Sequence, residues 1–284
     1  MAIFTNQATL SYNNTITTSN IVTGEVLEVL SATKNSLNTQ YQYDETITYV
    51  ISINNTGVTA FNSLTLTDDL GAYTIGGLTV TPLTYEPNTV SYYVNGVLQA
   101  TPVVAAGPPL VISNINVPAG GNAIILYEAR VNQYAPLAVG STIVNNAEIS
   151  GSGLTTPIVV TNTVTVAEEA KLSITKSLNP ETVAENGQLT YTFTIQNIGN
   201  IPAVATDDVT ITDIFNPILD NITVTLNGTI LTTPAQYVYD DTTGVFQTVA
   251  GVITVPAATF TQDAITGQWN IVPGVTVLTI TGTV

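Results

Sequence analysis

The sequence predicts an all-β protein made of two tandem β-sandwich domains. Short segments alternate apolar and polar residues with period two and are rich in Thr, Val, Ile and Tyr, for example Ile47–Ile53, Leu64–Thr67 and Leu189–Ile195. Such alternation is typical of half-buried strands. Two Asn-Gly pairs, Asn95-Gly96 and Asn227-Gly228, separate strand-like runs and predict β-hairpins. Many short strands separated by frequent turns, with no helical stripe, favour β-sandwiches.

The composition excludes several classes of function. The 284 residues include 20 acidic and 4 basic side chains, with no His and no Cys. A Ser-His-Asp triad, a Cys nucleophile, a zinc site, haem ligation and an iron–sulfur cluster therefore have no ligands or bases, and we expect no cofactor, no metal and no enzyme activity. A net charge of -16 argues against nucleic acid and against anionic membrane surfaces as partners.

An internal repeat organises the chain. Residues 19–57 match residues 161–199 without gaps, and the match includes Leu30-Ser31-Ala32-Thr33-Lys34 against Leu172-Ser173-Ile174-Thr175-Lys176. With small insertions and deletions it continues through Leu64–Asp68 against Val209–Asp213, and it ends with Val131 beside Val284. Each copy has the length of a small sandwich domain.

The repeat is out of phase with the termini. The first copy continues into residues 141–150, for which the second copy has no counterpart. Residues 3–11 resemble residues 142–150 instead. The sequence therefore predicts an N-terminal donor segment (1–23), a complete sandwich (24–166) and a sandwich that lacks its closing strand (167–284).

A sandwich without one strand exposes an apolar groove and unpaired backbone groups, which favours strand addition from another chain. We expect the N-terminal segment of one molecule to complete the second domain of the next. This contact is head-to-tail and generates an open homopolymer. The alternative is that residues 1–18 add to the adjacent domain of their own chain or remain a free flap.

Three polar residues per domain share strand faces with apolar neighbours. By alternation they should point into the core. In the first domain they are Lys34, Asp68 and Asn145; in the second they are Lys176 and Asp213, with Asn6 on the N-terminal segment as the counterpart of Asn145. Buried without partners, such groups would each cost several kcal/mol, so we expect them to meet.

The chemical interpretation is an autocatalytic Lys–Asn isopeptide bond. A desolvated lysine loses its proton more easily, and a desolvated carboxyl group can stay protonated and polarise the Asn carbonyl. The amine attacks and ammonia leaves. The alternatives are a buried, hydrogen-bonded Lys–Asp pair beside a satisfied Asn, or Asp68 and Asp213 acting as turn caps at strand ends.

The motifs resemble a known family. Leu172–Lys176, Ala184–Tyr191, Gln196–Gly199 and Val209–Asp213 are similar to the conserved repeat of Gram-positive and archaeal surface proteins, a domain of unknown function, and to the collagen-adhesin-type sandwich. The resemblance covers residues 25–284 and implies immunoglobulin-like or adhesin-like sandwiches, with the Lys in the first strand, the acid in a middle strand and the Asn in the last. The whole chain also resembles ribbon-appendage subunits of clostridial endospores.

These observations together predict a structural subunit of a self-assembling fibre on the cell or spore surface. Because the N-terminus lacks the pattern of a secretory signal, release from the mother cell is favoured, and a spore-surface or wall protein is the expected anchor. The competing hypothesis is an adhesin that recognises glycan or matrix. Trp269 with Tyr237, Tyr239 and Phe246 could form a sugar platform, although a core cluster of the second domain is favoured.

Overall fold

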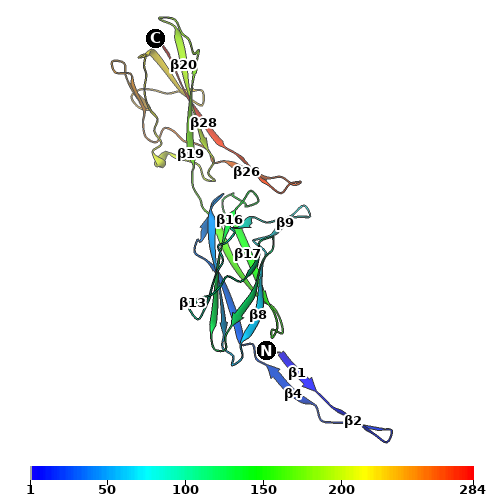
Figure 1. The fold of residues 1–284 in the computed structure, drawn as a ribbon. Helices are drawn as coiled ribbons and strands as arrows, with labels where there is room; N and C mark the ends of the chain where they lie inside the picture. Colours follow the sequence, from blue (N-terminus) through cyan, green and yellow to red (C-terminus); the bar gives the residue numbers. More distant parts are fainter. Residues whose placement is uncertain (1) are drawn as a thin grey trace.

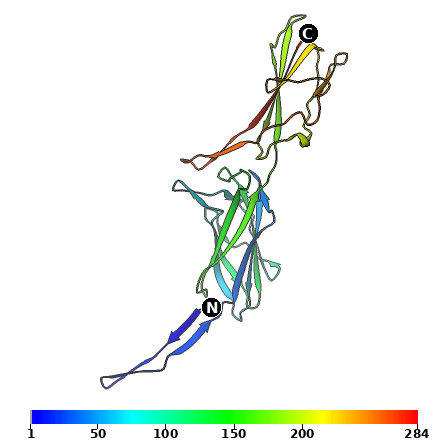
Figure 2. The same ribbon diagram turned by 180° about the vertical axis from the view of Figure 1, so that it is seen from behind.

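The computed structural model describes residues 2–284 and forms an extended molecule in three parts (Figure 1). A thin two-stranded ribbon at the N-terminus projects from one end of the first sandwich. The second sandwich follows at the other end, and the C-terminus lies at its far tip, as the view from behind also shows (Figure 2). The predicted all-β fold is confirmed, since the described residues contain 28 strands and one 3-10 turn, Ala205–Asp207.

The N-terminal ribbon is longer than the single donor strand that the sequence predicts. β1 (Ala2–Asn6) pairs with β4 (Val22–Val26), and β2 (Thr9–Tyr12) pairs with β3 (Thr15–Thr18), all antiparallel. Within residues 2–284 these four strands pair only with one another. Phe4 lies opposite Gly24, and its ring occupies the space above the glycine. These four strands therefore do not join the adjacent sheet of their own chain.

The first domain is a sandwich of two six-stranded sheets. One sheet has the order β13-β12-β16-β7-β5 with β11 also on β16, from β5 (Leu30–Ser36), β7 (Thr46–Asn55), β11 (Leu83–Tyr85), β12 (Ser91–Val94), β13 (Val97–Leu98) and β16 (Asn122–Val131). The other has the order β14-β15-β8-β17-β18-β6, from β6 (Gln40–Tyr41), β8 (Phe61–Asp68), β14 (Val103–Ala105), β15 (Leu110–Val117), β17 (Thr142–Ser150) and β18 (Ile158–Val166). A short hairpin, β9 (Tyr73–Ile75) with β10 (Leu78–Val80), lies beside them.

Period-two alternation builds the core of the first domain. In β7 the residues Ile47, Tyr49, Ile51 and Ile53 are fully buried, and the residues between them face outward. The turn at Asn95-Gly96 joins β12 to β13 as predicted, and Asn95 takes the left-handed conformation that such a turn requires.

The second domain repeats the first sheet but has a smaller second sheet. Its larger sheet has the order β19-β20-β28-β22-β23, from β19 (Leu172–Asn179), β20 (Gln188–Asn197), β22 (Asp220–Leu226), β23 (Thr229–Ile230) and β28 (Gly274–Thr283). The smaller has the order β21-β25-β24, from β21 (Thr212–Ile214), β24 (Tyr237–Asp240) and β25 (Val245–Thr248). A separate hairpin joins β26 (Thr259–Gln262) to β27 (Trp269–Val272).

One side of the second domain is open as a result. In the first domain β8 pairs with β15 on one edge and with β17 on the other, and β18 follows β17 and lies against β5. In the second domain β21 pairs with β25 only, and no strand within residues 2–284 stands where β17 and β18 would be. The difference is two strands, where the sequence predicted that one closing strand was missing.

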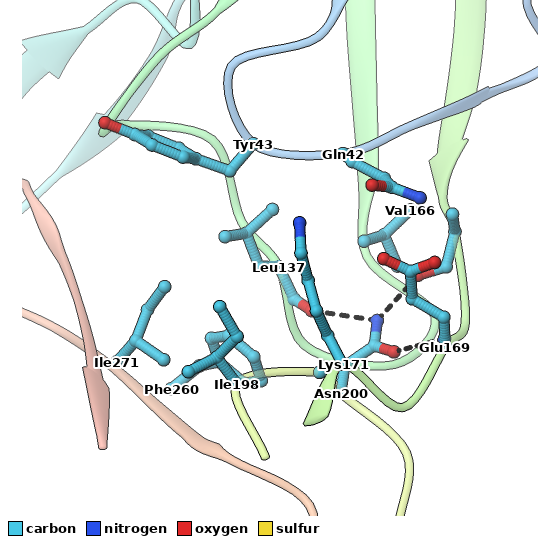
Figure 3. Close-up of a pocket in the computed structure, with 12 residues that line it drawn as sticks. Gln42, Tyr43, Leu137, Val166, Glu169, Lys171, Ile198, Asn200, Phe260 and Ile271 are labelled. Carbon is cyan, nitrogen blue, oxygen red and sulfur yellow. Dashed lines mark hydrogen bonds between the residues drawn. The ribbon is translucent and has the colours of Figure 1, made fainter. Parts of the chain in front are cut away.

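Hydrogen bonds connect the two sandwiches at their joint. Asn200 donates hydrogen bonds to the carbonyls of Leu137 (3.1 Å) and Ala167 (2.9 Å) and accepts one from the backbone of Glu169 (3.0 Å) (Figure 3). The β26–β27 hairpin reaches the first domain, where Trp269 donates to the hydroxyl of Tyr73 at 3.2 Å. The prediction that Trp269 joins the aromatic cluster of the second domain is therefore wrong.

We expect Asn200→Ala to weaken this joint. The substitution leaves two carbonyls and one amide without their side-chain partner in a buried position, which should cost about 1–3 kcal/mol. Chemical denaturation measures the loss, and small-angle X-ray scattering measures the angle between domains. Val58 holds the same place in the first repeat but is 97% exposed, so Val58→Ala is the matched control. Equal behaviour of both variants would contradict this role.

Candidate cross-linking and docking sites

The core of the first domain contains a closed cluster of polar side chains from five strands. Lys34 comes from β5, Asp68 from the end of β8 and Asn145 from β17, and all three are buried. Tyr49 from β7 and Tyr127 from β16 stack against each other with ring centroids 5.4 Å apart. Strand alternation turns each of these side chains inward, so the fold brings the three predicted residues of this domain into one site.

Asp68 is the centre of this cluster. Its Oδ2 accepts a hydrogen bond from Lys34 Nζ at 2.7 Å and a very short one from the hydroxyl of Tyr127. Its Oδ1 accepts from the backbone amide of Leu70 at 2.9 Å. Both side chains of the ion pair have no solvent exposure. Asp68 therefore holds the backbone just after β8, through the amide of Leu70, and also binds Lys34.

Burial sets the protonation of the cluster. Desolvation lowers the pKa of Lys34, and the attraction of Asp68 only partly opposes this effect. Desolvation also raises the pKa values of Tyr49 and Tyr127, so both phenols remain protonated hydroxyl groups. The lysine is thus biased toward the neutral amine, which is the nucleophilic form.

Asn145 is held by its carbonyl oxygen only. The backbone amide of Gly71 donates to Asn145 Oδ1 at 3.2 Å. The amide of Asn145 is buried beside the hydroxyls of the two tyrosines, but neither Asn145 Nδ2 nor Tyr49 Oη makes a hydrogen bond of good geometry. Buried polar atoms without partners are uncommon in folded proteins and often mark functional positions. Here the orphan atom is the nitrogen that would leave as ammonia.

The second domain repeats the ion pair in an open setting. Lys176 on β19 donates a very short hydrogen bond to Asp213 on β21. The side chains are 39% and 19% exposed, in contrast to their fully buried counterparts. Lys176 Nζ lies over the rings of Tyr191, Phe193 and Phe215 at 4.3, 5.4 and 5.5 Å from their centroids.

The second ion pair also lacks a counterpart of Tyr127. Tyr127 lies opposite Tyr49 on neighbouring strands, and the residue in the corresponding position opposite Tyr191 is Ile280. Asp213 therefore receives Lys176 and the amide of Ile214, but no phenol. The two sites share a lysine and an acid and differ in their remaining partners.

Asn6 is not near Lys176 and Asp213 within one molecule. It lies on the N-terminal ribbon, opposite Val22 on β4, and is exposed to solvent. The ribbon and the second domain are at opposite ends of the molecule (Figure 1). Of the six predicted residues, five form two intramolecular groups and the sixth stands apart.

Unusual apolar exposure is found on both the ribbon and the open side of the second domain. On the ribbon the exposed side chains are Ile3, Phe4, Leu10, Tyr12, Ile16, Ile21 and Val22. On the open side, β19 is exposed along most of its length, including Leu172 and Ile174, while its counterpart β5 alternates between buried and exposed residues. Exposed apolar strand surfaces of this kind mark interaction sites.

Other candidate sites are weak. Within residues 2–284 no group of three or more acidic residues is placed to hold a metal ion, and no helix has the length and apolar character needed to cross a membrane. A pocket at the joint is lined by Tyr43, Leu137, Lys171, Phe260 and Ile271, among others (Figure 3). It lies where the two domains and their linker meet.

Two features of the site were missed by sequence reasoning. Tyr49 and Tyr127 occupy ordinary inward positions of alternating strands, so the pattern gives no reason to separate them from apolar core residues. Asn55 and Asn197, which occupy the same position in the two copies of the repeat, are buried and bind the backbone of nearby loops. Asn55 donates to the carbonyls of Thr59 and Pro118, and Asn197 to those of Ile201 and Pro256.

Comparisons with known proteins find structural similarity only. No family model and no curated protein sequence matches the chain. The pilus backbone protein of Streptococcus pneumoniae is similar over 86% of this chain and 55% of its own (11% identity, TM-score 0.36). The major pilin subunit of Bacillus cereus is similar over 95% of this chain and 73% of its own (14% identity, TM-score 0.34). The collagen-binding domain of a Staphylococcus aureus adhesin is similar over 50% of this chain and 99% of its own (14% identity, TM-score 0.31). At these values the likenesses carry no argument about function.

We expect Tyr127→Phe to destabilise the first domain. The change removes the phenol that donates to Asp68 while keeping the stacked ring, so a buried carboxylate oxygen loses a partner at a cost of about 1–3 kcal/mol. Urea unfolding measures the change. Tyr43→Phe, at an exposed ring, is the control and should stay within about 0.5 kcal/mol of the wild type. An equal, small effect of both changes would contradict the assigned role of Tyr127.

Proposed function

We propose that this protein is the structural subunit of a self-assembling surface fibre, in which the N-terminal ribbon of one molecule completes the second domain of the next. A single observation carries the proposal: no strand within residues 2–284 stands in the places of β17 and β18 in the second domain, and the ribbon is a two-stranded counterpart of that pair. The sequence likeness of residues 3–11 to residues 142–150 supports the same match.

The first domain supplies the docking geometry. There Ala147 lies opposite Asp68 and Ile149 opposite Leu66 where β17 pairs with β8. In the repeat the corresponding pairs are Ala8 with Asp213 and Leu10 with Ile211. A ribbon docked in this register puts Phe4, Asn6, Ala8 and Leu10 on the inner face, as Ile143, Asn145, Ala147 and Ile149 are in β17. The second strand of the ribbon then lies beside β19, as β18 lies beside β5.

The free ribbon needs a small adjustment to dock. In the first domain Ile143 pairs with Val164, and the sequence match predicts Phe4 opposite Val22. The ribbon instead pairs Phe4 with Gly24, two residues further along. In the β1–β4 ladder this two-residue difference keeps the same faces together because side chains alternate with period two. The β2–β3 ladder pairs Leu10 with Thr17, one residue from the position that corresponds to Ile158 opposite Ile149. The irregular segment between the ribbon's two ladders, where the amide of Ser19 donates to the carbonyl of Ala8, is the natural place for the change.

Head-to-tail growth follows from the positions of donor and acceptor. The ribbon leaves one end of the molecule and the open side belongs to the domain at the other end (Figure 1). A contact between two different surfaces repeats without limit unless the rotation closes a ring. An isolated two-stranded ribbon is marginally stable in water, so burial of its apolar residues in a neighbour gives a clear driving force.

Covalent reinforcement uses the polar clusters. In the first domain Lys34 transfers one proton to Asp68, and its neutral Nζ attacks Cγ of Asn145. Asp68 gives its proton to the departing nitrogen, the Cγ–Nδ2 bond breaks and ammonia leaves. The attacking nitrogen gives one of its two remaining hydrogens to Asp68 as a proton, so the new bond is a neutral secondary amide and Asp68 ends protonated. Between subunits Lys176, Asp213 and the partner's Asn6 have the same roles. These are bonds formed once per site, so the subunit is structural and has no turnover of substrate.

We expect Leu10→Asp to abolish assembly. It places a charge on the inner face of the docked ribbon, where desolvation is costly. Thr9→Asp is the control because Thr9 is the neighbour on the outer face, and this variant should still form fibres. Electron microscopy and light scattering of purified protein measure assembly. Fibres from Leu10→Asp subunits would mean that another segment fills the open side.

The competing hypothesis, an adhesin, is tested with the same variant. If the protein is a binding module, soluble Leu10→Asp subunits should bind on a glycan or matrix array, and the pocket at the joint is the place to map such a ligand. Location on a cell or spore surface is the setting we propose for the fibre, and immunogold labelling of whole cells and spores tests it.

We expect the cross-links to be visible by mass and by gel. Monomeric Leu10→Asp protein should be lighter than its sequence by one ammonia, and Asn145→Ala should remove that deficit because the reacting amide is gone. Boiled wild-type fibres should give ladders, whereas Asn6→Ala and Lys176→Ala fibres should run as monomers. A full-mass first domain, or monomers from boiled wild type, would contradict the respective bond.

A further inference from the structure

We infer that the second lysine site is inactive in the free subunit and reacts only after the neighbour's ribbon has covered it. This inference rests on the proposed assembly and concerns its order of events. The first domain would cross-link on folding, whereas the bond between subunits would follow docking.

The two lysine sites differ in their access to water. The Lys34–Asp68 pair is completely enclosed, while Lys176 and Asp213 are 39% and 19% exposed. In general, water stabilises the charged forms of amines and carboxylic acids, and loss of that solvation favours the neutral forms. In the first domain β17 and β18 remove the water. In the second domain nothing within residues 2–284 does so.

The aromatic partners of Lys176 also differ from those of Lys34. Three aromatic rings, those of Tyr191, Phe193 and Phe215, lie under its Nζ, whereas Lys34 has one, that of Tyr49. An aromatic face attracts an ammonium group but not a neutral amine. Tyr191 and Phe215 are stacked with centroids 5.0 Å apart, so this surface is already built before docking. The rings thereby hold the lysine in position before the ribbon arrives.

The second site also lacks its amide until docking. Asn145 is carried by β17 inside the first domain, whereas the corresponding Asn6 is carried by a ribbon at the far end of the molecule. The same docking step therefore supplies the electrophile and removes the solvent. The product is an amide between Lys176 Nζ and Asn6 Cγ of the neighbour, with one ammonia released and no other reagent required.

Gating of this kind protects correct assembly. Each exposed lysine remains unreacted until an entire ribbon has docked. A ribbon docked in the wrong register can therefore dissociate before a bond forms. Premature reaction with solvent-exposed amides of other proteins is avoided for the same reason.

Two defective subunits limit the covalent product to a dimer, because donor subunits add to one another only non-covalently. The acceptor is Leu10→Asp, which keeps Lys176 and an open second domain but cannot donate its ribbon. The donor is Lys176→Met, which keeps a normal ribbon but cannot react at its own second site. We expect each one alone to lose a single ammonia from its first domain. Mixed, they should give a covalent dimer that is lighter by three ammonia molecules in total.

Size-exclusion chromatography and intact-mass measurement separate the outcomes. With Asn6→Ala added to the donor, a complex with the acceptor should still form in native buffer, but denaturant should separate it into monomers that together lack only two ammonia molecules. A complex that is stable in native buffer but separates into monomers in denaturant, with the unmodified ribbon, would overturn the gated reaction and leave the proposed assembly standing. No complex in native buffer would overturn both. A further ammonia lost by the acceptor alone, mapped to Lys176 by peptide mass spectrometry, would show that the free site is not inactive.

Discussion

The molecule depends on the closure of a sandwich by a pair of adjacent strands. In the first domain β17 continues the sheet from β8, and β18 covers the side of the core beside β5. These two strands exclude water from Lys34 and Asp68. Where no such pair is present, the same residue types in the second domain remain partly exposed. Burial, ion-pair chemistry and the availability of a docking surface all follow from whether this pair of strands is in place.

The two domains act as a comparison within one chain. Both keep the strand carrying the lysine, an acid on a strand of the facing sheet and an asparagine at the end of β7 or β20 that binds nearby backbone. They differ at positions near the open side and at the joint. Asn200 binds the linker and the first domain, while its counterpart Val58 is exposed at the opposite end of the first sandwich. The two copies of the repeat therefore agree at residues that hold each sandwich together. They differ at surfaces where we expect a neighbouring domain or subunit.

The sequence was sufficient to predict the fold class, the Asn-Gly hairpins and the inward position of Lys34, because period-two alternation is a local property. It did not predict that the donor is a ribbon. Residues 15–26 are mostly exposed and their alternation has no buried face, so the second strand gave no clear pattern. Tyr127 was missed because a core tyrosine looks like any inward aromatic residue. Trp269 was misplaced because the β26–β27 hairpin replaces a short turn in the first copy, near Gly120, and has no counterpart there to guide its position.

The direction of β17 and β18 has a mechanical consequence. Both strands run along the length of the first sandwich (Figures 1 and 2). The hydrogen bonds between antiparallel strands are perpendicular to the strands. A ribbon seated in the same direction in the second domain would therefore meet a pull along the fibre as shear. All the hydrogen bonds of the ladder would resist together, whereas a pull across the strands would open them one after another. The orientation of a single pair of strands would thus let a filament without disulfides carry tension.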